Sequence, residues 1–99
     1  MAKKIVWSKR ALVERIDILE FWKFKNKSIR FSLKLDELFL EKIELVSIHP
    51  NIGKMTEFEN IRYKIARDYL IFYEIFETEI HILSIKYGKQ HPLKFRNLK

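Results

Sequence analysis

Two stretches of the chain carry apolar residues at the three- and four-residue spacing of an amphipathic helix. The first spans residues 9–24, with an apolar stripe of Leu12, Ile16, Leu19 and Trp22. The second spans residues 29–48, with an apolar stripe of Phe31, Leu35, Leu38, Phe39, Ile43 and Val46. Ser8 is the predicted N-cap of the first helix, because its hydroxyl can accept a hydrogen bond from a free backbone N–H group. Between the helices, Asn26 is the predicted left-handed stop and Ser28 the next N-cap. Pro50 ends the second helix, so the pattern predicts a helical hairpin.

The remaining apolar runs are typical of strands. Residues 3–7 alternate loosely, whereas residues 61–65 alternate strictly and place Arg62 and Lys64 on one face, opposite Ile61, Tyr63 and Ile65. Residues 70–76 are almost continuously apolar, as expected for a strand that is covered on both faces. Residues 80–87 form the last strand, and residues 54–60 are predicted to be an irregular connection.

Taken in order, these elements predict one α+β domain over residues 1–99. The order is β-α-α-β-β-β, with the two-helix hairpin packed on one face of a sheet in which antiparallel pairing dominates. Hydrophobic residues make up 47% of the 99 residues, and cysteine is absent, so the core must form without disulfides. No apolar run approaches the roughly 18–20 residues that cross a bilayer. We therefore expect a cytoplasmic domain.

Charge is unevenly distributed along the chain. Lys and Arg number 20 against 13 Asp and Glu, a formal net charge of +7. Basic domains of this size often bind polyanions, because contacts from Lys and Arg to phosphates release counterions; solubility through net charge is the alternative. No acid follows Glu79, and the basic residues after it are Lys86, Lys89, Lys94, Arg96 and Lys99. The first four of these are the predicted nucleic-acid contacts.

Several short motifs, taken in order, resemble those of one toxin superfamily. Val6-Trp7-Ser8 with Ala11 resembles its opening strand and helix start. Residues 48–53 resemble the end of its second helix, and residues 68–75 resemble its central strand. Residues 82–85 resemble its last strand, and residues 89–92 resemble the basic residues before a proline. Together these motifs cover nearly the whole chain, which resembles the RelE/ParE toxins of type II toxin–antitoxin systems, a group that includes plasmid stabilisation proteins.

This resemblance implies a toxin that a cognate antitoxin neutralises, and it implies no cofactor. RelE-like toxins cleave mRNA on the ribosome, whereas ParE-like toxins inhibit DNA gyrase and do not cut RNA. Ribosome-associated mRNA cleavage is our first hypothesis, and a non-catalytic inhibitor of gyrase is the alternative. A DNA-binding or adaptor domain is a third possibility, but the chain lacks a helix-turn-helix signature.

Metal-independent RNA cleavage needs a base for the 2′-hydroxyl, cations for the charge that grows on the phosphate, and an acid for the leaving oxygen. The resemblance places Lys64 at a sheet lysine of the RelE pattern and implies a tyrosine near the C-terminus. Histidine can act as base or acid near neutral pH. The predicted catalytic residues are Lys64, Arg62, Arg67, His91 and Tyr87. Two arginines of the RelE pattern are absent, because Leu70 and Gln90 stand in their places.

Each of these residues also has a purely structural interpretation. Arg62 and Lys64 can form the solvated face of a strand, Arg67 can belong to a turn with Asp68, and His91 can be an exposed loop residue. The three histidines are far apart in sequence and lack the H-x-x-x-H or H-E-x-x-H spacing, so no metal site is predicted.

The antitoxin is expected to be a short chain, rich in acidic residues, that lies across the toxin. Exposed apolar residues of the helical hairpin are the candidates for its docking site, namely Phe21, Phe24 and Phe31. The alternative is that these aromatic side chains belong to the hydrophobic core.

Overall fold

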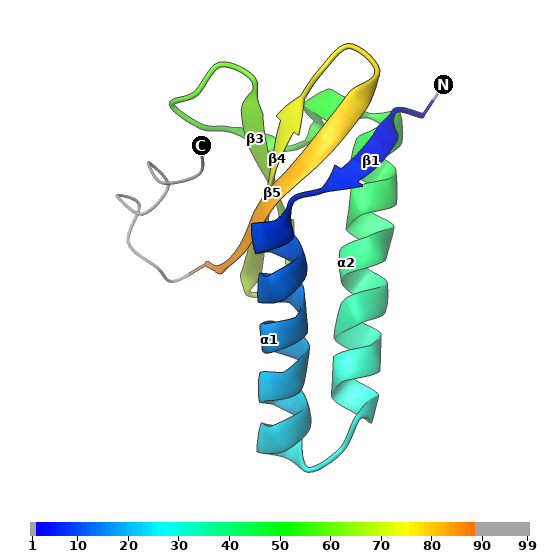
Figure 1. The fold of residues 1–99 in the computed structure, drawn as a ribbon, viewed down its shortest axis with the longest axis vertical. Coiled ribbons are helices and arrows are strands. Elements are labelled where there is room, and N and C mark those ends of the chain that lie inside the picture. Colours follow the sequence, from blue (N-terminus) through cyan, green and yellow to red (C-terminus); the bar gives the residue numbers. More distant parts are fainter. Residues whose placement is uncertain (1, 89–99) are drawn as a thin grey trace.

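The computed structural model describes residues 2–88, which form two helices and one five-stranded sheet (Figure 1). In chain order the elements are β1 (Lys4–Trp7), α1 (Lys9–Asn26), α2 (Arg30–Ile48), a 3₁₀ turn (Pro50–Ile52), β2 (Lys54–Met55), β3 (Ile61–Ala66), β4 (Tyr69–Ile75) and β5 (Glu79–Tyr87). The strands lie in the order β1-β5-β4-β3-β2. β1 pairs in parallel with β5, and the other pairs are antiparallel. The predicted α+β architecture, with its helical hairpin and mostly antiparallel sheet, is confirmed.

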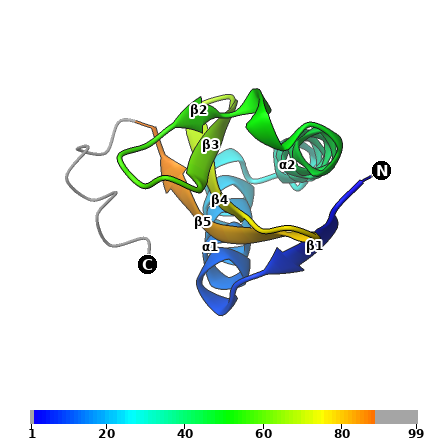
Figure 2. The same ribbon diagram turned by 90° about the horizontal axis from the view of Figure 1, so that it is seen from above.

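The main core lies between the hairpin and one face of the sheet (Figure 2). Its largest fully buried side chains include Phe39 and Leu35 from α2 and Tyr73 and Ile71 from β4. Ile61 and Phe72 form a smaller cluster with partly buried neighbours that include Tyr63 and Leu83. The far end of the hairpin projects beyond the sheet, so its tip is reached from solvent on several sides (Figure 1).

Ser8 joins β1, α1 and β5. Its side chain accepts a hydrogen bond from the backbone N–H of Ala11, as predicted for an N-cap, at 3.0 Å. The same hydroxyl donates to the carbonyl of Leu83, and the Ser8 backbone N–H donates to the carbonyl of Ile82. The start of α1 is therefore fixed to the part of β5 that extends past the end of β1.

A tyrosine fixes the turn that follows α2. The Tyr73 hydroxyl donates to the carbonyl of Pro50 at 2.6 Å and accepts from the backbone N–H of Gly53 at 3.0 Å. A Cβ on Gly53 would lie 2.4 Å from that hydroxyl and 2.8 Å from the carbonyl of Tyr63. This position therefore accepts only glycine without rearrangement.

The structure corrects the predicted hairpin boundary. The left-handed residue is Lys27, with φ of 51°, rather than Asn26, which remains helical. The N-cap of α2 is Ile29, which makes no side-chain cap, while the Ser28 hydroxyl accepts from the backbone N–H of Arg30 at 3.2 Å. The helix therefore begins one residue later than Ser28 capping predicts.

The sheet also differs from the prediction in two places. Lys54 and Met55, predicted to be irregular, form β2 and pair with Tyr63 and Arg62 of β3. The pairing of β4 with β5 shifts register between Phe72 and Tyr73. This bulge interrupts the two-residue alternation of β5, so Ile82 and Ile85, three residues apart, both belong to the main core. Among the described residues, no helix is both long and apolar enough to span a membrane.

Candidate functional site

Arg62 and Lys64 lie on the same face of β3, as the alternation predicts. Arg62 pairs with Tyr73 and Lys64 with Ile71, and both partners belong to the core beneath the helices. The guanidinium of Arg62 donates from Nη1 to the carbonyl of Gly53 at 2.9 Å and to that of Asn51 at 3.3 Å. Both cations are therefore directed to the helix-covered side of the sheet, and Arg62 helps to hold the turn after α2.

Arg67 lies in the tight turn between β3 and β4. Its backbone is left-handed, with φ of 55°. The guanidinium carbon lies 5.5 Å from the ring centre of Phe31, the geometry of a cation–π contact. The structure therefore places Arg67 against α2, at the other end of β3 from Arg62.

Lys86 and Tyr87 lie at the end of β5, beside α1. The Lys86 ammonium is 2.9 Å from Oε2 of Glu14, and the Tyr87 ring packs edge-on against Tyr69 at 5.7 Å. The other predicted contacts of the C-terminal tract, Lys89, His91, Lys94 and Arg96, lie outside the described residues.

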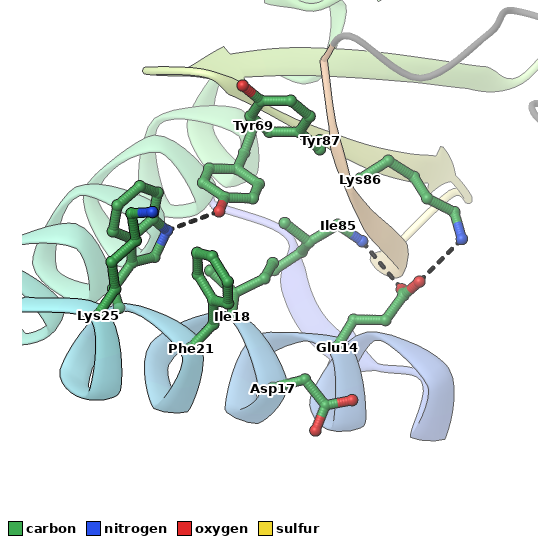
Figure 3. A pocket seen from close by; sticks show the side chains of 10 residues that line it. Glu14, Asp17, Ile18, Phe21, Lys25, Tyr69, Ile85, Lys86 and Tyr87 are labelled. Atoms are coloured by element: carbon green, nitrogen blue, oxygen red, sulfur yellow. Dashed lines mark hydrogen bonds and ion pairs between the residues drawn. The ribbon is translucent and has the colours of Figure 1, made fainter.

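A groove of about 490 Å³ opens between α1 and the end of β5. Ile18 and Phe21 of α1 form an apolar wall, with Tyr69, Ile85 and Tyr87 opposite (Figure 3). Trp22 of α1 also lines the groove. Its charged lining residues are Glu14, Asp17, Lys25 and Lys86. A groove that is mostly apolar, with a few charged groups at its margin, is suited to binding a segment of another protein.

Glu14 lies at the margin of this groove and joins α1 to β5. Its Oε1 accepts from the Ser84 hydroxyl at 2.7 Å. Oε1 also accepts from the Ile85 backbone N–H at 3.1 Å, and Oε2 accepts from Lys86 (Figure 3). The carboxylate thus occupies the edge of β5 where β1 has already ended. Trp22 adds a second link, because its indole N–H donates to the Tyr69 hydroxyl at 2.7 Å.

The hairpin tip forms a second, smaller hollow of about 390 Å³. It is lined by Lys23, Phe24, Lys27, Ser28 and Ile29. Phe24 is 83% exposed and Phe21 is 55% exposed, so both side chains lie at the surface. Phe31 instead packs against the core and contacts Trp22 at 5.1 Å, which agrees with the alternative interpretation for that residue.

The tip is strongly basic. From Phe21 to Leu35 the chain contains no acidic residue, while the basic residues in this stretch are Lys23, Lys25, Lys27, Arg30 and Lys34. This absence of acidic residues is visible in the sequence, but the prediction of an anion-binding surface considered only the C-terminal tract. The tip is thus a second concentration of positive charge, and it has exposed apolar side chains at its centre.

Two groups of the described chain have shifted pKa values. The hydrogen bond from Arg15 to Asp36 raises the pKa of that guanidinium above its ordinary value. Burial raises the pKa of the Tyr73 hydroxyl, against the smaller opposing effects of the Gly53 hydrogen bond and the charge of Arg62. Both pKa shifts arise at contacts that hold the fold together, between the two helices and at the turn after α2. Among residues 2–88, no three His, Cys, Asp or Glu side chains gather to hold a metal ion.

Comparison with known families identifies the class. Residues 5–92 match the family described as the ParE toxin of the type II toxin–antitoxin system parDE. The chain therefore belongs to the ParE toxin family within the RelE/ParE superfamily, and it is a type II toxin with a cognate antitoxin as its partner. No curated relative matches the sequence significantly.

A solved structure supports the fold independently. The chain is similar to one in a structure titled "Chromosomal ParDE TA system from P. aeruginosa", with a TM-score of 0.73 over 89% of this chain and 98% of that one. The sequence identity is 15%. The two chains share the fold.

Proposed function

We propose that this toxin acts by binding and inhibiting DNA gyrase and does not cleave mRNA. The observation that carries the proposal is that, within residues 2–88, two of the cations predicted for cleavage, Arg62 and Arg67, are held at opposite ends of β3. A cleavage site needs several donors within about 3 Å of one phosphate. Arg62 donates to backbone carbonyls, and Arg67 lies over Phe31 at the opposite end of the strand.

The spacing along β3 makes convergence difficult. Arg62 and Ala66 are separated by about 13 Å of strand, at roughly 3.3 Å per residue. Arg67 follows Ala66 in the turn, so its guanidinium and that of Arg62 start from opposite ends of β3. Leu70 and Gln90 also replace two arginines of the RelE pattern. Membership of the ParE family supports the same assignment.

We also propose that the antitoxin docks along the exposed side of α1. Phe24 at the tip and Phe21 beside the groove lie three residues apart on that helix, so their side chains are neighbours. Lys23, Lys25 and Lys27 surround them with positive charge. An amphipathic acidic segment can place apolar side chains in the two hollows while its carboxylates meet these lysines.

Expression in cells tests the mode of action. If the toxin does not cleave RNA, Lys64→Ala with Arg67→Ala leaves growth inhibition intact, and mRNA 5′ ends show no codon-phased cuts. A non-toxic double variant that stays folded, together with phased cuts from the wild type, contradicts the proposal and favours the nuclease.

Co-expression tests the docking site. Phe24→Glu places a carboxylate in the basic tip and is expected to release the toxin from neutralisation by the product of the adjacent gene. Met55→Glu is the matched control, because Met55 is 70% exposed on β2, away from the hairpin. Equal neutralisation of the two variants contradicts docking at the tip.

A further inference from the structure

The face of the hairpin that points away from the sheet carries four exposed aliphatic side chains. Leu12 and Ile16 of α1 are 41% and 58% exposed, and Leu33 and Leu40 of α2 are 56% and 44% exposed. At 100° per residue, all four lie on the outward sides of their helices, beside the line where α1 meets α2. We refer to these four residues as the hairpin seam. It lies on a different side of α1 from Phe21 and the groove.

Two contacts fix the register of the helices. Arg15 forms a two-bonded ion pair with Asp36, at 2.7 and 2.8 Å, and the Ser32 hydroxyl donates to the carbonyl of Leu19. One turn from the ion pair toward the sheet end, Leu12 and Leu40 lie at the same height. Ile16, next to Arg15, lies close to the height of Leu33. The seam therefore contains two apolar layers.

Exposed charges continue these layers at both ends. Further toward the sheet end, Lys9 of α1 lies within about 3 Å of the height of Glu44 of α2, at 1.5 Å per residue. Toward the tip, Glu20 of α1 is level with Arg30 of α2. At each of these two heights, the two helices thus carry opposite charges. The surface therefore has no excess of positive charge here, in contrast to the tip.

We propose that the seam binds a second copy of this chain, forming an antiparallel four-helix bundle. A two-fold axis parallel to the helices lays α1 of one copy on α2 of the other and keeps every residue at its own height. Leu12 then meets Leu40 of the second copy, and Ile16 meets Leu33. The charged layers become self-complementary, since Lys9 faces Glu44 and Glu20 faces Arg30.

This charge pattern favours a second copy over the other occupants. An acidic antitoxin gains more at the tip, where five basic residues have no acidic neighbour in sequence. The hairpin face is about 27 Å long and about 20 Å wide, because each of its two helices is about 10 Å wide. A dimer through this face therefore buries roughly 1,100 Å² in total, summed over the two copies. That area lies near the lower end of stable interfaces, so we expect a weak, reversible dimer in the micromolar range. The inference does not depend on which cellular target the toxin inhibits.

Sedimentation velocity of the purified chain tests the dimer directly. Between about 1 and 200 μM, the mass is expected to rise from 12.1 kDa toward twice that value. Ile16→Lys and Leu33→Lys each bury a charge opposite an aliphatic side chain, so each is expected to raise the dimer Kd at least tenfold (about 1.4 kcal/mol). Met55→Lys, an equally large change at an exposed site, leaves the Kd unchanged.

A charge exchange tests the orientation. Glu20→Arg sets two arginines against each other and is expected to weaken the dimer about threefold to tenfold, whereas Glu20→Arg with Arg30→Glu restores it. The chain has no cysteine, so Ile16→Cys and Leu33→Cys chains can be mixed and oxidised. The proposed axis predicts a disulfide between the two variants and little within either one alone.

Three results overturn the proposal. The first is a chain that remains monomeric up to about 200 μM. The second is a dimer that the seam variants do not weaken, which assigns the interface to another face. The third is a monomer in which the backbone amides of the seam become protected from hydrogen exchange only when the antitoxin is added. That result assigns this face to the antitoxin. Because none of these experiments contains the cellular target, their results do not depend on which target the toxin inhibits.

Discussion

Replacement of Glu14 by alanine is expected to destabilise the fold more than any other exchange of a charged residue on α1. The carboxylate accepts three hydrogen bonds, from the Ser84 hydroxyl, the Ile85 N–H and Lys86. In Glu14→Ala, two of these donors lose their partner inside the protein. Ser84 is 0% exposed and Ile85 is 2% exposed, so water replaces the carboxylate poorly.

The magnitude follows from these contacts. Each buried donor without a partner costs about 1–3 kcal/mol. Loss of the ion pair adds little, because the Lys86 side chain is 22% exposed and its ammonium can be hydrated in place of the lost carboxylate. We therefore expect a loss of about 2–4 kcal/mol, which lowers the Tm by roughly 10–25 °C for a chain of this size. Glu14→Gln keeps an acceptor for both neutral donors and is expected to lose only about 1 kcal/mol.

Urea unfolding followed by circular dichroism measures these differences. Asp17→Ala is the matched control, because Asp17 is an exposed acid on the same side of α1 and it lines the same groove. We expect that control to stay within about 0.5 kcal/mol of the wild type. If Glu14→Ala is no less stable than Asp17→Ala, the carboxylate does not hold the edge of β5 as described.

Three further predictions concern the turn after α2. Tyr73→Phe removes the hydroxyl that joins Pro50 and Gly53 and is expected to lower stability by about 1–3 kcal/mol in thermal unfolding. The pKa of Tyr73 in the folded protein is raised above 10.0, so its contribution to stability is retained below pH 10 and falls as the pH rises above that value. The free energy of unfolding, measured against pH in the alkaline range, is therefore expected to fall more steeply in the wild type than in Tyr73→Phe. Gly53→Ala brings a Cβ to within 2.8 Å of a backbone carbonyl, so we expect a larger loss than from Tyr73→Phe, and equal stability to the wild type would refute the close contact.

Hydrophobic periodicity was sufficient to predict the hairpin and the three long strands, because each buries one side against a common core. It missed β2, since Lys54 and Met55 are both exposed and carry no alternation. It also misplaced the left-handed residue of the hairpin. Asn26 and Lys27 are adjacent polar residues, and the geometry of the closing turn decides between them.

The candidate site was less predictable, for physical reasons. Alternation along β3 separates Arg62 and Lys64 from Ile61 and Tyr63, but it does not say which face the helices cover. The contact between Glu14 and Ser84 joins residues 70 positions apart, and neither has a signal in the sequence alone. The basic stretch from Phe21 to Leu35 was visible as composition. Whether this stretch is exposed could not be predicted, because its exposure depends on how far the hairpin projects beyond the sheet.

The proposed mode of action is tested most directly by a supercoiling assay with purified gyrase, relaxed plasmid and ATP. We predict that the chain abolishes supercoiling in a dose-dependent manner, that added antitoxin restores it, and that mRNA in a parallel translation reaction remains intact. Supercoiling that proceeds at every toxin concentration, together with phased cleavage of the mRNA, would contradict the account and identify the chain as a ribosome-associated nuclease.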